Sequence, residues 1–285
     1  MTDPLVSVVI PTFRREAVLL EAILSALNAG EVPLEILVLD DSAEGSAAAH
    51  VGGLADERVQ YVHRSKPSGG VPAIVRNEGL AMARGRYVHF LDDDDVLERG
   101  ALAALVGALE KAPRAGVAMG TVVPFGDDED LLAYQRQYFT AAADRLRAAR
   151  GQMQLVSGML FESTPLVNSS CMIRKTCAVA IGGYAPDIPL CEDVDFFMRA
   201  IRHSGFVFID RPVVRYRTGE PSLMQTLGGY TPLFIGSYRT IHQRYRQQHG
   251  AVEFFLLKLL AFGRRHTRRL LRRRGKASPP IAPFE

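Results

Sequence analysis

The chain has 285 residues, which fits one large domain or one domain with a smaller appendage. Hydrophobic residues make up 47% and charged residues 23%, which is typical of a globular protein with a sizeable core. Three cysteines without a C-x-x-C pair argue against a disulfide framework and indicate a reduced, cytoplasmic protein. We expect no signal peptide, because the N-terminus lacks a basic segment followed by a long apolar stretch. We expect no membrane helix either, because no apolar run reaches the ~18 residues that a span needs.

Short apolar runs alternate with segments of helical periodicity along the first half of the chain. Strands are predicted at residues 6–11, 34–41, 59–63, 86–91 and 115–125, and helices at residues 16–30, 73–85 and 99–112. This alternation predicts an α/β fold with a mixed, mostly parallel sheet flanked by helices.

The pattern loosens at residues 126–165, where an acidic loop leads into a helix. Strand and helix patterns resume at residues 168–217, and from residue 225 onward the chain reads as helix. A helical extension at the C-terminus is therefore expected.

Polar residues follow three of the predicted strands, at residues 11–15, 40–42 and 92–95. In open α/β sheets ligands bind beyond the carboxyl ends of the strands, so these clusters are candidates for one site. Taken alone, Asp41 and Ser42 could equally begin a turn or cap a helix.

Four aspartates in a row, Asp92 to Asp95, are the densest negative charge in the sequence. Carboxylates this close raise one another's pKa and cost stability, unless a cation compensates them. Clustered carboxylates at a strand end commonly hold Mg²⁺ or Mn²⁺ beside a phosphate, and the alternative is a solvated acidic turn. A second acidic pair, Glu192 and Asp193, opens a predicted helix, where acids also favour the helix dipole.

Together these segments resemble glycosyltransferase family 2, the inverting nucleotide-sugar enzymes of the GT-A fold. The resemblance rests on "VSVVIPTFRR", "LVLDDSAEG", "GGVPAIVRNEGLAMARGRYVHFLDDDDVL" and "GGYAPDIPLCEDVDFFMRAIRHSG", in the family's order and spacing over about residues 6–217. It implies a GT-A domain over residues 1–222, with a nucleotide-binding part to about 125 and an acceptor part from about 126. A basic helical extension over residues 223–285 follows.

The resemblance also implies roles for single residues on the donor side. Pro11, Thr12, Arg14, Asp41, Arg76, Asp92 and Asp93 would bind the nucleotide-sugar donor. Asp41 would accept a hydrogen bond from uracil or thymine, which favours a UDP- or dTDP-sugar. Asp94 and Asp92 would hold the Mn²⁺ or Mg²⁺ cofactor.

On the acceptor side, the resemblance makes Asp193, with Glu192 beside it, the catalytic pair. Asp193 would act as the general base that takes a proton from an acceptor hydroxyl. The acceptor would be a saccharide or a glycolipid, in cell-surface polysaccharide or glycolipid synthesis. One departure concerns Gly219, which stands where the family often carries a histidine; Arg217 or Glu220 could substitute for it.

The net charge of +3 comes from the end of the chain, where residues 264–276 hold seven arginines, one lysine and no acid. Phe255, Leu259, Phe262 and Leu270 fall on one helical stripe beside these cations. This composition favours a peripheral contact with an anionic membrane surface, at the inner face of the cell membrane. A helix docked on the body and an oligomer contact are alternatives, while nucleic acid is not expected.

Three other functions are compatible with parts of the sequence. The aspartate run also fits a haloacid-dehalogenase-type phosphatase with Asp92 as nucleophile, although several strand–helix units precede it. A nucleotidyltransferase would want a glycine-rich loop after the first strand, which is absent. A non-catalytic nucleotide-binding scaffold with a GT-A body is the third alternative.

Overall fold

The buried apolar runs form one eight-stranded sheet in the computed structural model, which describes residues 4–29, 32–219 and 231–273. Their side chains are described as far as residue 266. The strands are β1 (Val6–Thr12), β2 (Leu34–Asp40), β3 (Val59–His63), β4 (Tyr87–Phe90), β5 (Val96–Leu97), β6 (Val117–Phe125), β7 (Cys171–Arg174) and β8 (Phe206–Arg217).

The strand order is β3-β2-β1-β4-β7-β6-β8-β5. Strands β1 to β4 pair in parallel, as do β6 and β8. Strand β7 lies antiparallel between β4 and β6, and β5 pairs antiparallel with β8. The mixed, mostly parallel sheet expected from the sequence is confirmed.

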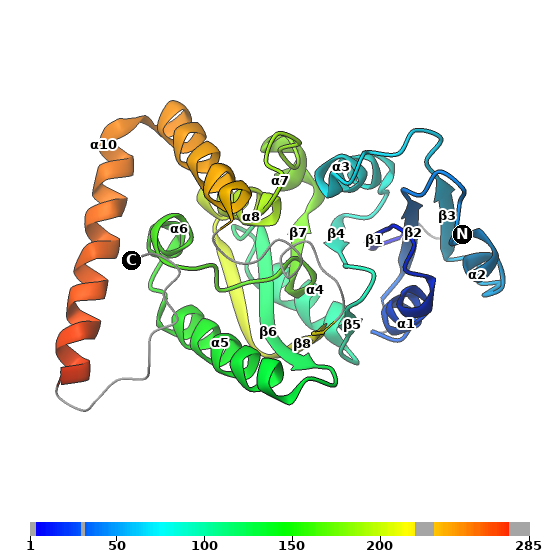
Figure 1. Cartoon of the computed structure of the whole chain (residues 1–285), viewed down its shortest axis with the longest axis horizontal. Coiled ribbons are helices and arrows are strands. Elements are labelled where there is room, and N and C mark those ends of the chain that lie inside the picture. The colour runs from blue at the N-terminus through cyan, green and yellow to red at the C-terminus, as the bar shows by residue number, and fades with distance from the viewer. Residues whose placement is uncertain (1–3, 30–31, 220–230, 274–285) are drawn as a thin grey trace.

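Helices cover both faces of the sheet (Figure 1). They are α1 (Glu16–Leu27), α2 (Ala48–Gly52), α3 (Pro72–Met82), α4 (Ala101–Lys111), α5 (Glu129–Ala148), α6 (Gln152–Phe161), α7 (Lys175–Ala180), α8 (Glu192–Ser204) and α10 (Pro232–Arg273), with a 3₁₀ turn at Asn168–Ser170. Strand residues alternate between two cores, so that Val8 and Ile36 face α1 and α4, whereas Val9 and Leu37 face α3 and α8. Burial on both faces explains why these strands read as continuous apolar runs.

Helix α10 is bent at Gly250, whose φ of 84° breaks the helix into two arms (Figure 1). The second arm packs on α6, where the Ser157 hydroxyl donates to the Leu257 carbonyl at 2.7 Å. The first arm is joined to the segment before α8, because the backbone N–H of Leu190 donates to the Ser237 hydroxyl at 3.2 Å. The helical extension predicted from the sequence is therefore present, and it is docked on the body.

The side of the second arm that faces away from α6 carries apolar side chains. Phe255, Leu259 and Phe262 of the predicted stripe are 59%, 50% and 69% exposed, while the side chain of Leu270 lies outside the described residues. Val252, Leu256 and Leu260 extend this exposed surface, and we call the six residues the apolar stripe. Within the described residues, no helix combines the length and the apolar character that crossing a membrane requires.

Candidate active site

Most of the predicted donor residues lie at the carboxyl ends of β1, β2 and β4, which are neighbours in the sheet, while Arg76 comes from α3. Pro11 and Thr12 end β1, where they pair with Leu39 and Asp40 of β2. The Thr12 hydroxyl donates to Oδ2 of Asp93 at 2.8 Å, which ties the end of β1 to the aspartate run after β4. Parallel pairing thus brings together residues 81 positions apart in the chain.

The aspartate run forms a turn in which exposed and buried side chains alternate. The side chains of Asp92 and Asp94 are 31% and 13% exposed, whereas those of Asp93 and Asp95 are buried. A backbone hydrogen bond of 3.1 Å from Asp95 to Asp92 closes the turn. The two positions predicted to hold a metal are therefore the two that a ligand can reach.

Burial and mutual repulsion make this turn electrostatically unfavourable on its own. Burial, followed by the charge of Asp94, raises the pKa of Asp93 to about 6. Burial also raises the pKa of Asp94, and that of Asp95 well above its ordinary value. Oδ2 of Asp95 is buried without a hydrogen-bond partner in the described part of the chain. Added positive charge would relieve this repulsion.

Part of that positive charge comes from Arg15. Its Nη1 donates to Asp93 at 3.0 Å and to Asp94 at 2.8 Å. Arg14, the residue predicted from the sequence, has a φ of 54° and pairs at the surface with Glu44. The sequence alone does not show which of two adjacent arginines contacts the aspartates. The left-handed backbone at Arg14 turns Arg15 toward them.

Asp41 lies at the end of β2 with both carboxylate oxygens in use. Oδ1 accepts from the guanidinium of Arg64 and from the backbone of Ser68, and Oδ2 accepts from the Ser68 hydroxyl. The neighbouring Asp40 accepts from the backbone of Ser42 and Ala47 and has a structural role. Arg64 and Ser68 were not anticipated, because nothing in the sequence marks them as partners of Asp41.

Arg76 connects the donor residues with the second acidic pair. Its buried guanidinium donates from Nη2 to Asp92 at 2.8 Å and from Nη1 to Glu192 at 2.5 Å. The guanidinium also lies over the ring of Tyr184, 5.5 Å from the centroid. Asn168, which the sequence did not single out, donates to the same oxygen of Asp92 at 3.1 Å.

Two close contacts hold the segments of the site together. Asn77 donates to the Tyr184 carbonyl at 2.9 Å and accepts from its backbone N–H at 2.7 Å. Gly183, with a φ of 70°, leaves room for this pair, since a Cβ there would come within 2.4 Å of Asn77. Helix α3, which carries Arg76, is therefore fixed against the loop before α8.

Glu192 and Asp193 begin α8, directly after Cys191 with its left-handed φ of 60°. A strained residue of this kind commonly marks a functional site. Burial, followed by the charge of Glu192, raises the pKa of Asp193 to about 7. Oδ1 of Asp193 accepts from the backbone N–H of Val194 at 2.8 Å. Asp195 points elsewhere and pairs with Arg199 inside the protein.

The strand that carries the histidine in the family runs past the aspartate turn. Arg217 donates from Nε to the Asp94 carbonyl at 2.8 Å and from its backbone to Asp95 at 3.1 Å. Gly219 has a φ of 91°, and Glu220 lies outside the described residues. Of the two predicted substitutes, Arg217 is the one seen to contact the turn.

Comparisons with known proteins agree with this geometry. The family model described as Glycosyl transferase family 2 matches residues 7–176, more than half of the chain. An uncharacterised protein of Mycobacterium tuberculosis is 29% identical over 212 residues, which are 72% of this chain and 65% of that protein. GalNAc(5)-diNAcBac-PP-undecaprenol beta-1,3-glucosyltransferase of Campylobacter jejuni is 38% identical over 109 residues, 36% of this chain and 34% of that enzyme. The chain thus matches about a third to two thirds of the length of these relatives.

Among solved structures, S. aureus TarS in complex with UDP-GlcNAc has a similar fold. The TM-score is 0.68 at 16% identity, over 93% of this chain and 72% of that chain. The expected GT-A fold is thereby confirmed, and the phosphatase and nucleotidyltransferase alternatives lose their support. Because this family model matches residues 7–176, the chain belongs to glycosyl transferase family 2, a family of glycosyltransferase enzymes.

Proposed function

We propose that the chain is an inverting glycosyltransferase that moves a sugar from a UDP- or dTDP-sugar to a hydroxyl group of a saccharide or glycolipid. One observation carries the proposal. Arg76 bonds to Asp92 at the end of β4 and to Glu192 at the start of α8, so the donor and acceptor carboxylates share one site. Such a site can hold a sugar nucleotide on one side and a hydroxyl on the other.

The names of related proteins support a sugar-nucleotide donor and a role in polysaccharide synthesis. The Campylobacter jejuni relative is named a glucosyltransferase, and a relative from Escherichia coli, 33% identical over 95 residues, is named a putative colanic acid biosynthesis glycosyl transferase. The structural neighbour TarS binds UDP-GlcNAc and UDP. A uracil or thymine base would donate its N3–H to the carboxylate of Asp41, beside the hydrogen bonds that Arg64 and Ser68 make to it.

Asp193 is the proposed general base. Because its pKa is raised to about 7, the carboxylate can take a proton at neutral pH and can lose it again. The acceptor oxygen attacks the anomeric carbon as its proton passes to Asp193. The bond from that carbon to the diphosphate breaks on the opposite face, which inverts the configuration, and the nucleoside diphosphate leaves with the bonding electrons. Glu192 is held by Arg76 and adds the negative charge that keeps Asp193 basic.

The aspartate turn fits a divalent cation such as Mn²⁺ or Mg²⁺. In the described residues no three His, Cys, Asp or Glu side chains gather to hold a metal alone. Mg²⁺, however, is often held by one or two carboxylates together with substrate phosphates. Asp92 accepts hydrogen bonds from Arg76 and Asn168 at Oδ1, and Asp94 accepts one from Arg15 at Oδ2. No side-chain donor of the described chain reaches the second oxygen of either carboxylate, so both could bind a cation. When bound there, the cation would supply positive charge to the departing diphosphate.

Calorimetric titration with UDP, dTDP and GDP, each with Mn²⁺ and with EDTA, tests this proposal. We expect UDP or dTDP to bind only with Mn²⁺, and Asp94→Ala to abolish this binding. Asp130→Ala, an exposed aspartate of α5, is the matched control and should bind as the unaltered protein does. Binding of no nucleotide would contradict the donor proposal, and binding without any transfer to acceptors would favour the scaffold alternative.

A peripheral contact with an anionic membrane surface is part of the same proposal. The apolar stripe, exposed along the second arm of α10, supports this contact. Arg264 pairs with the buried Glu162, and the cations that follow it up to residue 276 would strengthen the contact, because basic residues are attracted to anionic lipid. Such a contact would bring the enzyme to lipid-linked acceptors.

A further inference from the structure

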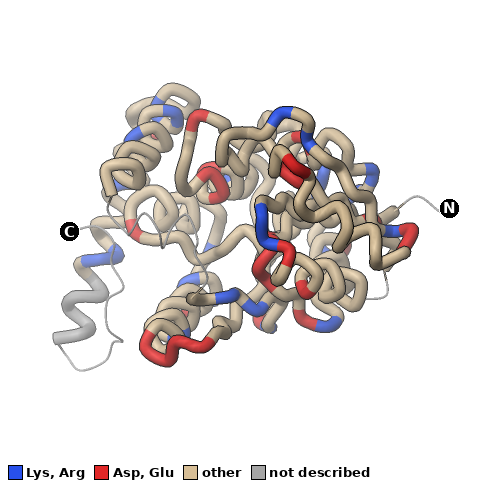
Figure 2. The backbone as a smooth tube through the Cα atoms, turned by 45° about the vertical axis from the view of Figure 1, so that its right-hand side comes forward, with Lys and Arg blue, Asp and Glu red and all other residues tan. Residues whose placement is uncertain are grey.

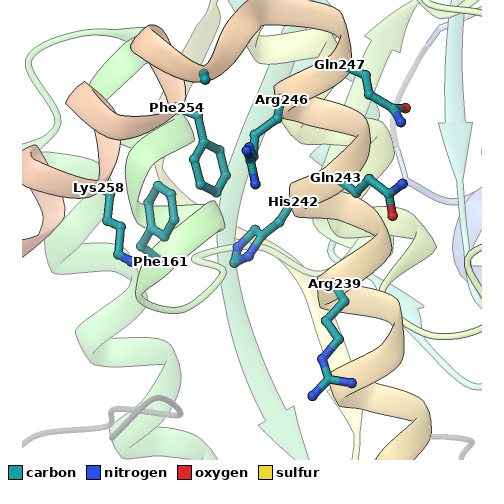
Figure 3. A pocket seen from close by; sticks show the side chains of 9 residues that line it. Phe161, Arg239, His242, Gln243, Arg246, Gln247, Phe254 and Lys258 are labelled. Carbon is teal, nitrogen blue, oxygen red and sulfur yellow. The ribbon is translucent and has the colours of Figure 1, made fainter.

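A groove lies away from the candidate active site, where the two arms of α10 meet α6. It has a volume of about 750 Å³ and is open to solvent. Figure 3 shows side chains from both arms and from Phe161 of α6 around it. Its lining is formed by Phe161, Arg239, His242, Gln243, Arg246, Gln247, Ala251, Phe254 and Lys258.

The groove carries three positive charges and no negative one. Arg239 and Arg246 come from the first arm and Lys258 from the second. In the described chain none of the three forms an ion pair, although Arg244 on the same helix pairs with Asp187. In several other places acidic and basic positions lie next to each other (Figure 2). Three cations around one groove without a carboxylate favour an anionic ligand.

The rest of the lining suits the phosphate end of an amphiphilic molecule. Nε2 of His242 lies 2.7 Å from the carbonyl oxygen of Leu160, and this contact fixes the imidazole ring against α6. Arg246 lies over the ring of Phe254, 5.8 Å from its centroid, so the groove offers apolar surface beside its charge. The amides of Gln243 and Gln247 can donate hydrogen bonds to phosphate oxygens.

The apolar stripe begins at the edge of this groove. Lys258 lines the groove, while Phe255 and Phe262, three and four residues away on the same arm, are exposed beside it. Residues three and four apart are neighbours on a helix surface. Charge and apolar surface are therefore continuous, as in a protein surface that meets lipid headgroups above lipid tails.

We propose that this groove binds the phosphate headgroup of an anionic phospholipid through Arg239, Arg246 and Lys258 while the apolar stripe enters the lipid layer. The proposal rests on the membrane contact proposed above and adds a defined headgroup site to it. No bond is made or broken in this step. The active site would then be held at a set orientation to the membrane surface.

Vesicle flotation with the full chain tests the headgroup site. Vesicles of phosphatidylcholine alone are compared with vesicles that also contain phosphatidylglycerol. The triple variant Arg239→Gln, Arg246→Gln, Lys258→Gln should bind the anionic vesicles at least about tenfold more weakly, since each cation near such a surface adds attraction. The control Arg99→Gln, Lys111→Gln, Arg114→Gln removes the same charge from exposed positions elsewhere and should bind almost unchanged.

Other variants separate the headgroup site from the membrane contact itself. Phe255→Ser, Leu259→Ser, Phe262→Ser should weaken binding to both vesicle types, because these side chains are exposed and the buried face of α10 stays intact. No vesicle binding by the unaltered chain would contradict the membrane contact and the groove together. Equal losses in the groove variant and its control would overturn the groove alone.

A soluble phosphate distinguishes a lipid headgroup from a free anion. Glycerol 3-phosphate at millimolar concentration should bind the groove much more weakly than the vesicle surface does, because the apolar stripe contacts only the lipid. Binding of this compound to the groove in solution, together with unchanged vesicle binding of the triple groove variant, would overturn the lipid assignment. The three single groove variants are measured in parallel, so that a folding defect of the triple variant does not remove the test, and unchanged UDP binding confirms an intact donor site.

Discussion

Arg76 and Glu192 are 116 positions apart in the chain, yet Nη1 of Arg76 donates to Oε1 of Glu192 at 2.5 Å. The guanidinium is buried and also serves Asp92, so it neutralises two carboxylates that would otherwise repel each other. This single side chain joins the strand end that carries the aspartate turn to the helix that carries Asp193.

Replacing Arg76 should therefore damage both stability and activity. Arg76→Met leaves the buried carboxylate of Glu192 and the partly exposed one of Asp92 without their cation, and breaking a buried ion pair typically costs about 3–5 kcal/mol. Urea unfolding would measure the loss. Arg147→Met, which removes an exposed arginine from its pair with the exposed Asp210, is the comparison and should cost much less. Equal losses in the two variants would show that Arg76 does not bridge the site.

The rate of sugar transfer should depend on pH through Asp193. With a pKa of about 7, the base is protonated below neutral pH, so kcat/KM should rise as the pH increases through 7 and then level off. UDP release from UDP-sugars in the presence of saccharide and lipid-linked acceptors would report this rate. Asp193→Asn should retain UDP binding and lose transfer. A variant that kept most of its rate would exclude Asp193 as the base.

The same pKa predicts a change of stability with pH. Because the folded protein binds the Asp193 proton more tightly than the unfolded chain, the stabilisation is complete at low pH and is lost as pH rises to about 7. Asp193→Asn cannot ionise and should lack this part of the decline. Unfolding midpoints of both proteins between pH 5 and 8 would test the difference, and parallel pH curves would contradict it.

The neighbours Arg14 and Arg15 offer a matched pair for the electrostatics of the aspartate turn. Arg15→Gln removes the cation between Asp93 and Asp94 and should destabilise the fold by about 1–3 kcal/mol. Arg14→Gln removes an exposed pair with Glu44 and should leave the unfolding midpoint unchanged. Thermal unfolding of both variants decides the matter. The reverse order would mean that Arg14 faces the turn in solution.

Replacing two helical glycines with alanine should change the stability of the protein in opposite directions. At Gly79 of α3 a Cβ would come within 2.3 Å of Val9 in β1, so Gly79→Ala should cost about 1–3 kcal/mol through overpacking. At Gly107 of α4 no atom lies within 4 Å of the added Cβ, and Gly107→Ala should stabilise the helix by up to about 1 kcal/mol. A neutral Gly79→Ala would show that α3 can shift on the sheet.

Much of the sheet could be predicted from the sequence, because its strands are buried on both faces and read as apolar runs. The position of β7 could not. Its four residues lie antiparallel between β4 and β6, and periodicity carries no information on the direction or the neighbours of a strand. The two-residue strand β5 is too short to give a pattern.

The candidate site, like the sheet, could be predicted from the sequence only in part. Thr12, Asp41 and the aspartate run could be placed at one edge, since parallel strands align their carboxyl ends. Arg15 and Arg64 could not, because an ion pair depends on which way a side chain leaves a turn. The roles assigned to the predicted residues stay predictions until the variants above are measured.

The bond between Leu190 and Ser237 has a practical consequence for shortened versions of the enzyme. It fastens the first arm of α10 to the segment that leads into Glu192 and Asp193, and the ring of Tyr238 packs on Leu190 beside it. A protein cut before this arm would lose the contact that supports Glu192 and Asp193, and a loss of turnover from this cause could be mistaken for the effect of a lost membrane contact. Point substitutions on the outer surface of the helix avoid this confusion, because they leave the contact between Leu190 and Ser237 in place.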